Sequence, residues 1–270
     1  MCGISGFFHA KRDFTKERAK YQEILDSMND RIRRRGPDDS GTFLSPHFGL
    51  AHVRLSIVDL VTGHQPMFKT VQGQTWGIVY NGELYNTDEL RQELKGLGHT
   101  FETASDTEVI LTSYLEYGPE FVTKLNGIFA IAIMDPVQDR LILYRDRAGV
   151  KPLFYTVAEE TVVFSSELKG LLCFPGIKPR ISKNGLNEIF SIGPARTSGT
   201  GVFEDVYEVL PGHYLICAPD HCRQDCYWKL ESHPHEDSYE KTIETTAFLV
   251  EDSIRRQMVS DVPVCTFLSG

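Results

Sequence analysis

A cysteine stands second in the sequence, directly after Met1, in the stretch MCGISGFF. Two interpretations compete for Cys2: it is a small apolar residue in a buried first strand, or a nucleophile that becomes the first residue once Met1 is removed. An α-amine has a pKa of about 7.7 to 8.0, against about 8.5 for a free thiol, so the amine of a processed chain can accept the thiol proton. On its own, the motif MCG favours the buried strand residue.

Polar residues also interrupt three apolar stretches farther along the chain. Arg54 opens RLSIVDL, Asn81 and Gly82 lie in YNGELYN, and Asp106 lies in SDTE. Each has a structural interpretation: a surface ion pair for the arginine, a hairpin turn for the Asn-Gly dipeptide, and a favourable first helical turn for the aspartate. Taken alone, the three stretches leave both kinds of interpretation open.

A second group of reactive side chains gathers in GHYLICAPDHCRQDCYWKL. Its cysteines and histidines make a zinc site conceivable. However, the stretch alternates like two strands around a Pro-Asp turn, which scatters these side chains over both faces of a hairpin. We therefore expect a hairpin without metal, and reduced thiols, since no secretory signal precedes the six cysteines of the chain. The residues concerned are His213, Cys217, His221, Cys222 and Cys226.

The charge balance excludes some classes of partner. Lys and Arg total 28 against 37 Asp and Glu, a formal charge of −9, which argues against nucleic acid or an anionic membrane as the main partner. No apolar run approaches the roughly 18 residues that span a bilayer. Lys11 and Arg12 follow the first apolar stretch instead of preceding it, so a signal peptide is not expected. We expect a cytoplasmic protein that acts on small polar metabolites.

The spacing of apolar residues predicts the elements. Helices are expected over 15–34, over 87–95, and from Ser105 to Gly118, where Ser105 and Glu108 match a capping box. Strand-like stretches fill 2–9 and 41–81, and four more follow between 127 and 167. Strands on both sides of a helical middle predict an α+β fold, with the four later strands forming a second antiparallel sheet that stacks on the first.

The composition changes after Trp228. Residues 231–238, ESHPHEDS, are polar and predicted to be a linker between a first domain, 1–230, and the start of a second, 239–270. The second part begins with a helical stripe and ends in the strand-like VPVCTFLSG. A lone helix and strand cannot bury their apolar faces, so we interpret this part as the truncated beginning of a domain. The stripe consists of Ile243, Ala247, Val250, Ile254 and Met258.

Across these domains, the order and spacing of nine stretches resemble a known family, the glutaminase domain of glutamine-dependent asparagine synthetases. This is a class II, or N-terminal-nucleophile, glutamine amidotransferase domain, and the resemblance covers nearly all of residues 2–230. It implies a four-layer αββα sandwich of two antiparallel sheets flanked by helices. The stretches are MCGISGF, RRRGPDDSG, AHVRLSIVDL, GHQPM, YNGELYN, SDTEVIL, LNGIFAIAIMD, RDRAGVKPLFY and FSSELKGLL.

The resemblance assigns roles to single residues. Cys2 would attack the side-chain amide of glutamine and form a thioester, while Asn81 and Gly82 would stabilise the oxyanion. The α-carboxylate of glutamine would bind Arg54, whose guanidinium suits bidentate pairing, and the residues that follow it. Asp106 and Glu83 would hold the ammonium group. The residues that follow Arg54 in the predicted glutamine site are Leu55, Ser56, Ile57 and Val58.

The resemblance also implies which substrates and cofactors the glutaminase domain and the full-length enzyme would use. The glutaminase would need glutamine and neither a cofactor nor a metal, whereas ATP, magnesium and aspartate would be used by the full-length enzyme. Phe267, Ser269 and Gly270 would belong to a nucleotide site that this chain leaves incomplete. Two alternatives stay open: the same glutaminase serving a sugar or surface-polymer amidotransferase, and a non-catalytic interaction module. The sequence leaves the oligomeric state open, a homodimer being one option.

Overall fold

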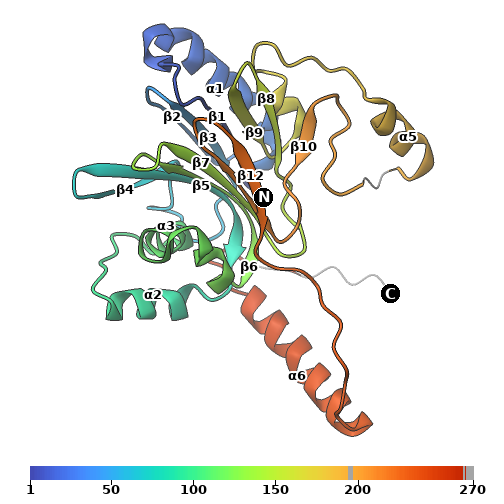
Figure 1. Ribbon diagram of the computed structural model, residues 1–270. Coiled ribbons are helices and arrows are strands. Elements are labelled where there is room, and N and C mark those ends of the chain that lie inside the picture. Colours follow the sequence, from blue (N-terminus) through green and yellow to red (C-terminus); the bar gives the residue numbers. More distant parts are fainter. Residues whose placement is uncertain (194–196, 264, 266–270) are drawn as a thin grey trace.

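Two antiparallel sheets stacked face to face form the body of the molecule (Figure 1). The computed structural model describes residues 1–193, 197–263 and 265. The first sheet has the strand order β10-β8-β9-β1-β3-β2 and the second has the order β12-β11-β7-β6-β5-β4. The first sheet comprises β1 (Gly3–Phe8), β2 (Asp39–Leu44), β3 (Phe48–Arg54), β8 (Phe154–Ala158), β9 (Thr161–Ser165) and β10 (Val206–Glu208). The second comprises β4 (Met67–Val71), β5 (Gln74–Leu84), β6 (Gly127–Asp135), β7 (Arg140–Arg145), β11 (His213–Cys217) and β12 (Cys222–Cys226).

Helices cover both outer faces of this sandwich. Helix α1 packs on β1, β2 and β3, and α4 packs beside it on β8 and β9. Helix α3 covers the second sheet over β4 and β5, and α2 packs on α3. The predicted α+β fold with four αββα layers is therefore confirmed. The helices are α1 (Arg18–Ile32), α2 (Thr87–Gly96), α3 (Asp106–Tyr117), α4 (Leu168–Leu171), α5 (Lys183–Ser191) and α6 (Tyr239–Gln257), with short 3₁₀ turns over Phe14–Glu17, Arg33–Arg35 and Gly118–Lys124.

Three apolar clusters hold these layers together. One lies between the sheets, and the other two lie under α1 and under α2 and α3. Strand β6 is buried almost throughout. Strands β5 and β7 pair with its two edges, the first sheet packs on one of its faces, and the helix layer covers the other. This explains its nearly continuous apolar sequence. The central strands thereby form a rigid base for any residue placed at their ends.

The predicted distribution of strands between the sheets is wrong in one respect. The stretches between 127 and 167 do not form a second sheet among themselves: β6 and β7 join β5, whereas β8 and β9 return to the first sheet beside β1. Strands β4 and β5, expected with the early strands, lie in the second sheet. Strands buried on both faces carry similar apolar runs, so their sequences identify them as strands without specifying their partners.

The capping box predicted for the third helix is half correct. Ser105 is the N-cap of α3, and its hydroxyl accepts a hydrogen bond from the amide of Thr107 at 3.2 Å. Glu108 does not reach back to the N-cap amide. Its carboxylate instead accepts from the amides of Glu102 and Thr103, at 3.0 and 2.8 Å, and so holds the loop before the helix.

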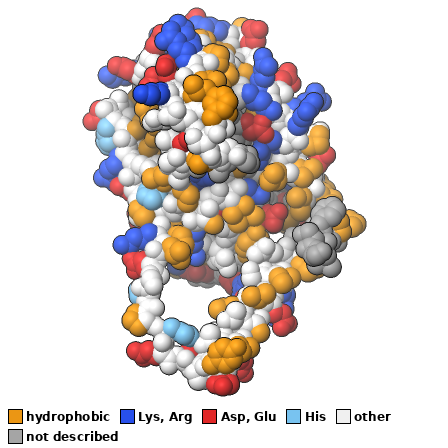
Figure 2. Space-filling view, turned by 90° about the vertical axis from the view of Figure 1, so that its right-hand side faces the viewer, with side chains coloured by type: hydrophobic (Ala, Val, Ile, Leu, Met, Phe, Trp, Pro, Cys, Tyr) orange, Lys and Arg blue, Asp and Glu red, His pale blue; other side chains and the backbone are white. Residues whose placement is uncertain are grey.

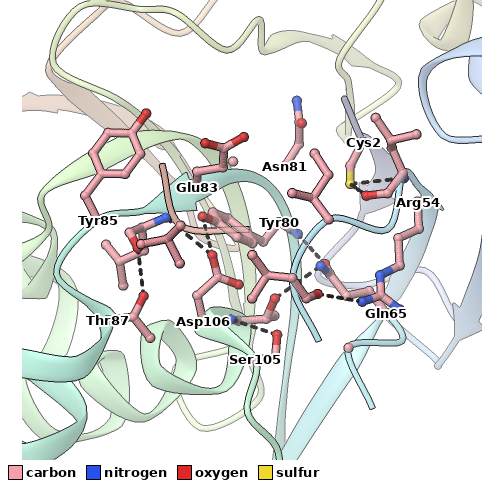
Figure 3. A pocket seen from close by; sticks show the side chains of 18 of the residues that line it. Cys2, Arg54, Gln65, Tyr80, Asn81, Glu83, Tyr85, Thr87, Ser105 and Asp106 are labelled. Carbon is pink, nitrogen blue, oxygen red and sulfur yellow. Dashed lines mark hydrogen bonds between the residues drawn. The ribbon is translucent and has the colours of Figure 1, made fainter. Parts of the chain in front are cut away.

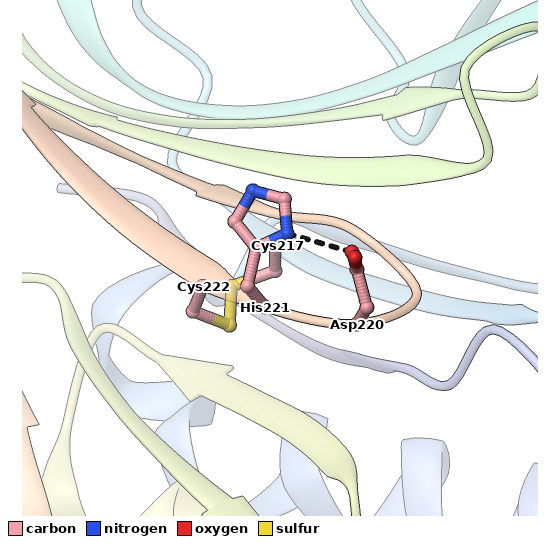
Figure 4. The surroundings of a disulfide bond; sticks show 4 residues. All are labelled: Cys217, Asp220, His221 and Cys222. Carbon is pink, nitrogen blue, oxygen red and sulfur yellow. Dashed lines mark hydrogen bonds and ion pairs between the residues drawn. A yellow bond between two sulfur atoms is a disulfide. The ribbon is translucent and has the colours of Figure 1, made fainter.

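The predicted hairpin is present as β11 and β12, but the thiol prediction is wrong for two of its cysteines. Cys217 and Cys222 form a disulfide at the end of the hairpin (Figure 4). The two residues are directly paired across the ladder, with their Cα atoms 4.2 Å apart, which brings the sulfur atoms within bonding reach. Cys2, Cys173, Cys226 and Cys265 are free.

The helix predicted after the linker is confirmed as α6, which extends away from the sandwich (Figure 1). Its apolar residues, among them Ile243, Phe248 and Ile254, are exposed, and hydrophobic side chains lie at the surface of this arm in Figure 2. Most of the strand predicted after it lies outside the described residues. Within the described part, no helix combines the length and the apolarity that crossing a bilayer requires.

Candidate active site

A pocket of about 200 Å³ opens where the first residues of the chain meet the end of β5 (Figure 3). Its walls come from the two residues before β1, the loop after β3, the second half of β5, and the beginnings of α2 and α3. The structure therefore brings together segments that are far apart in the sequence. The predicted site residues that line this pocket are Cys2, Arg54, Leu55, Ile57, Val58, Asn81, Gly82, Glu83 and Asp106.

Cys2 is held at the pocket by contacts of its backbone and of its sulfur. Its Sγ accepts a hydrogen bond from the Leu55 amide at 3.4 Å and lies 3.6 Å from the carbonyl oxygen of the same residue. Arg35, from the RGPDD stretch, donates from Nε to the Cys2 carbonyl at 2.8 Å and pairs through Nη1 with Glu167 at 3.2 Å. The thiol is consequently a half-buried group at the pocket wall and not a residue of the apolar core.

Burial has opposite effects on the two titratable groups at the start of the chain. It raises the pKa of the Cys2 thiol, which favours the protonated sulfur. It lowers the pKa of the α-amine of Met1 below its ordinary value of 8.0, and the positive charges of Lys151 and Arg35 lower that pKa further. The thiol needs a base before it can act as a nucleophile. The described residues that line the pocket include no histidine.

Asn81 presents an unpaired donor beside this thiol. The residue is 1% exposed, and its Nδ2 has no hydrogen-bond partner among the described residues. In Figure 3 the side chains of Asn81 and Glu83 project to the same side of β5, as alternation along a strand requires. A buried amide without a partner costs free energy, so this donor is available to an acceptor that enters the pocket.

The register of β5 directs a second donor to the pocket. Strand β4 pairs only with the first half of β5, so the second half has one edge without a neighbouring strand. The amides of Tyr80 and Leu84 both point to that edge, where they donate to Gln65 Oε1 at 2.6 Å and to Asp106 Oδ2 at 3.3 Å. Amides two residues apart point the same way in a strand, so the Gly82 amide faces this edge as well. No side chain in the described part of the chain accepts from it.

Gly82 also has a steric reason to be glycine. A Cβ atom at this position would collide with the carbonyl oxygen of Ile128 on the neighbouring strand and would lie 2.7 Å from the Tyr80 ring. Absence of a side chain lets β6 approach and leaves the amide open to the pocket. The Asn-Gly dipeptide is consequently part of a strand, Gln74–Leu84, and not the hairpin turn that the dipeptide alone favours.

Arg54, the last residue of β3, is 6% exposed and uses only part of its guanidinium internally. Its Nη2 donates to the carbonyl oxygens of Val58, at 3.0 Å, and of Asp59. Within the described part of the chain, Nε and Nη1 have no hydrogen-bond partner. The loop therefore holds one side of the guanidinium while leaving donors for an anion in the pocket.

Asp106 supplies negative charge on the opposite wall. Its Oδ2 accepts from the Tyr80 hydroxyl at 2.9 Å and from the Leu84 amide. Burial raises the pKa of this carboxyl, and the charge of Glu83 raises it further, while the two hydrogen bonds oppose the shift. Glu83 lines the same pocket. A positively charged group between these two carboxylates would relieve their repulsion.

Gln65 and Lys151 are two of the lining residues to which the sequence assigned no role in the site. Gln65 is 4% exposed and bridges β5 to α3, accepting from the Tyr80 amide and donating to Thr107 Oγ1 at 3.2 Å. Lys151 is 5% exposed, and burial lowers the pKa of its amine. Both lie in stretches that carried the family resemblance, GHQPM and RDRAGVKPLFY, so the signal was present without an assigned function.

Some predicted site residues do not join the pocket. Ser56 is not part of its lining; the Ser56 amide instead donates to Asp38 Oδ2 at 2.8 Å. Phe267, Ser269 and Gly270, predicted for a partial nucleotide site, lie outside the described residues. Among the residues that the structure describes, no three side chains of His, Cys, Asp or Glu converge as metal ligands would.

Comparison with known sequences agrees with this geometry. Residues 1–228 match the family described as "Glutamine amidotransferase domain". The whole chain is 47% identical over 270 residues to "Asparagine synthetase [glutamine-hydrolyzing] 3" of Bacillus subtilis, of which it covers 43%. It is 33% identical over 273 residues to "Asparagine synthetase B [glutamine-hydrolyzing]" of Escherichia coli, again covering 43% of that protein. "Amidase chry2" of Gibberella zeae is 37% identical over 290 residues, and the chain covers 41% of it. The chain thus spans less than half the length of these relatives.

Solved structures with this fold are known. "Glutamine phosphoribosylpyrophosphate (PRPP) amidotransferase from B. subtilis" aligns with a TM-score of 0.60 at 19% identity, covering 84% of this chain and 49% of that chain. "Structure of the allosteric regulatory enzyme of purine biosynthesis" aligns with a TM-score of 0.61 at 19% identity over the same shares. At this level of identity the likeness establishes a common fold.

Proposed function

Because the chain belongs to the family of glutamine amidotransferase domains, we propose that it hydrolyses glutamine to glutamate and ammonia through a thioester on Cys2. The observation that supports this most is the convergence, in one pocket, of the Cys2 thiol with two unpaired donors, Asn81 Nδ2 and the Gly82 amide. An oxyanion formed by attack of the thiol would lie between such donors.

The chemistry requires removal of Met1. While Met1 is attached, the nitrogen of Cys2 is an amide and has no basicity. After its removal, the α-amine of Cys2 takes the thiol proton as sulfur attacks the side-chain carbonyl carbon of glutamine, and electrons move onto the carbonyl oxygen. The C–N bond then breaks, the departing nitrogen takes the proton, and ammonia leaves. Water attacks the thioester, the C–S bond breaks, and glutamate and the thiol are released.

Charged side chains on two opposite sides of the pocket would fix the orientation of the substrate. Arg54 would pair with the α-carboxylate through the guanidinium nitrogens that the loop leaves unpaired. Asp106 and Glu83 would pair with the α-ammonium group on the other side. Leu55, Ile57 and Val58 would form the wall along the substrate. This orientation would direct the side-chain amide of glutamine at Cys2.

Release of glutamate from glutamine tests the proposal. The protein, Cys2→Ala and a control, Cys226→Ala, which removes an exposed free thiol on β12, are compared, with the N-terminal mass of each measured. We expect loss of Met1 in the parent and release that falls to background only in Cys2→Ala. Unchanged turnover by Cys2→Ala would reject the nucleophile. A processed but inactive parent would favour a non-catalytic interaction module. Chelation of divalent metals is expected to leave the glutaminase step unchanged.

The acceptor of the ammonia defines the full reaction. The 47% identity to an asparagine synthetase supports aspartate as the acceptor, activated with ATP and magnesium by the portion of the relatives that lies beyond this chain. The 37% identity to a protein named "Amidase chry2" supports a second candidate, the same glutaminase serving a different acceptor. Formation of asparagine from aspartate, glutamine and ATP by the full-length protein would decide for the first candidate, and glutamine-dependent amidation of another acid only would decide for the second.

A further inference from the structure

The segment after α6 returns to the glutamine pocket. Val259 is one of its lining residues. Two residues farther on, Asp261 makes two hydrogen bonds to the loop that follows β3: its Oδ2 accepts from the Asp59 amide at 2.8 Å, and its own amide donates to the Ile57 carbonyl at 3.0 Å. These two bonds, here called the Asp261 clasp, join a segment about 200 residues away in the sequence to the loop that carries the Arg54 contacts.

The other end of this segment is also fixed at the pocket. Arg256, in the last turn of α6, donates from Nη1 to Glu89 of α2 at 2.9 Å, and Glu89 lines the pocket. The ion pair is exposed and by itself adds little stability. Together with Val259 and the clasp, however, it makes the segment a strap that runs along the pocket from α2 to the loop after β3.

Asp59, which the Asp261 clasp holds through its amide, also binds the Arg54 guanidinium through its carbonyl oxygen. Asp59 has a backbone φ of +51°, a left-handed conformation that is uncommon for residues other than glycine. Its carboxylate accepts from the Thr62 amide at 2.8 Å and from the Thr62 hydroxyl at 2.6 Å, and its carbonyl accepts from Arg54 Nη2. The amide on one side of Asp59 thus binds Asp261, and the carbonyl on the other side binds Arg54.

We propose that Asp261 is a positioning residue for Arg54, which it orients through the backbone of Asp59. The inference rests on the proposed function, because Arg54 matters to the reaction only if it binds the α-carboxylate of glutamine. Without the clasp, the Asp59 amide loses its acceptor and the left-handed residue is less firmly held. The carbonyl that fixes one side of the guanidinium then turns, and the free nitrogens of Arg54 no longer point steadily into the pocket. The residue acts on substrate binding and not on the thiol.

The test compares Asp261→Ala, Asp261→Asn and a control, Asp237→Ala, in the full-length protein; Asp237 is exposed and lies just before α6. Loss of a hydrogen bond to a charged acceptor predicts that Asp261→Ala raises KM for glutamine about tenfold and leaves kcat within about twofold. Asp261→Asn keeps an oxygen acceptor and is expected to retain a KM near that of the parent. Hydrogen exchange of the 55–63 loop should accelerate in Asp261→Ala and stay unchanged in Asp261→Asn.

The outcomes separate the two proposals. A parent that releases no glutamate would overturn the proposed function and this inference with it. An active parent with an unchanged KM in Asp261→Ala would overturn the inference alone. A fall in kcat at constant KM, or equal effects of the alanine and asparagine variants, would equally contradict a positioning role exerted through Arg54.

Discussion

The two walls of the pocket are built in different ways. On one wall, Asn81 and Gly82 belong to the second half of β5, which pairs along one edge with β6. On the other wall, Arg54 stands at the end of β3 and is oriented by the carbonyls of a loop, which the Asp261 clasp holds in turn. The donors proposed to stabilise the oxyanion are thus placed by a strand ladder, and a group proposed to recognise the substrate is fixed by side-chain contacts.

This difference predicts how the walls respond to change. A donor on a paired strand is placed by many cooperative backbone hydrogen bonds, so it is already in position when the transition state forms. A guanidinium held by a loop depends on a few contacts, and a single substitution in the segment that supports the loop can weaken them. Substitutions on the strand wall should therefore act mainly on kcat, and substitutions on the loop wall mainly on KM.

Among substitutions that compare the two walls, Asn81→Ala gives the largest expected effect on turnover. The Nδ2 donor is buried and unpaired in the absence of substrate, so its loss removes an interaction made with the oxyanion. We expect kcat to fall by about 10² to 10³ with little change in KM. Steady-state glutamate release measures both constants, and Asn187→Ala, at an exposed position of α5, serves as the control. A rise in KM at constant kcat would break the distinction between the walls.

Stability at acid pH tests how the strand wall is supported. His52 of β3 bridges the two sheets: it is fully buried and its Nε2 lies 3.1 Å from the Tyr80 carbonyl on β5. Burial lowers the pKa of His52 to about 3. Between pH 6.5 and that value the unfolded chain binds a proton that the folded protein does not, so stability falls as the pH falls.

The contribution of this histidine amounts to about 3 kcal/mol between pH 7 and pH 4. Urea unfolding at the two pH values measures it. His52→Gln keeps a side-chain donor and does not titrate in this range, so we expect its loss of stability on acidification to be smaller by that amount. His233→Gln, which changes an exposed histidine, should lose as much stability as the parent. If His52→Gln and the parent lose equal stability between pH 7 and pH 4, protonation of His52 does not contribute to the pH dependence of stability.

Arg54→Lys probes the loop wall. An ammonium group cannot satisfy the loop carbonyls of Val58 and Asp59 and also present two parallel donors to a carboxylate. We expect KM for glutamine to rise by about 10- to 100-fold, with kcat changed far less. Arg34→Lys, at an exposed position after α1, is the matched control. A collapse of kcat at constant KM would place Arg54 among the groups that act on the reacting atoms.

The sequence specified the strand wall more completely than the loop wall. The apolar runs around Cys2 and Asn81 predicted strands, and strands are what the structure contains there. The motifs that carried the family resemblance also identified Arg54 and Asp106, which do line the pocket. Local pattern and motif were sufficient in these cases because they describe a residue and its immediate neighbours in the chain.

Contacts between distant segments could not be predicted in the same way. The placement of β4, β5, β8 and β9 in the two sheets depends on which strand edges pair, and similar apolar runs do not encode that choice. Asp261 reaches Asp59 through the return of the chain after α6, which no periodicity reveals. The absence of a secretory signal predicts reduced thiols, yet Cys217 and Cys222 form a disulfide because the hairpin places them opposite each other.

The smallest expected effect comes from Tyr80→Phe, which tests a contact between β5 and Asp106 of α3. The Tyr80 hydroxyl donates to Asp106 Oδ2 at 2.9 Å and thereby opposes the rise that burial causes in the pKa of that carboxyl. Without the hydroxyl, the pKa of Asp106 rises further, and the carboxylate that would pair with the substrate ammonium becomes protonated at a higher pH. KM for glutamine should therefore increase as the pH falls, and this increase should begin at a higher pH in Tyr80→Phe than in the parent.

At neutral pH the same variant should raise KM only about threefold, the size expected for one net hydrogen bond, because the Leu84 amide still binds Asp106. Measurement of KM and kcat across the acid range separates the two effects, and Tyr117→Phe, which removes a hydroxyl that donates to exposed Glu93, should follow the parent. A kcat that falls while the pH dependence of KM stays fixed would mean that Tyr80 supports the strand wall. In that case Tyr80, which lies on β5 and contacts the charged Asp106, would act on kcat. The separation between residues of β5 that affect kcat and charged side chains that affect KM would then not hold at Tyr80.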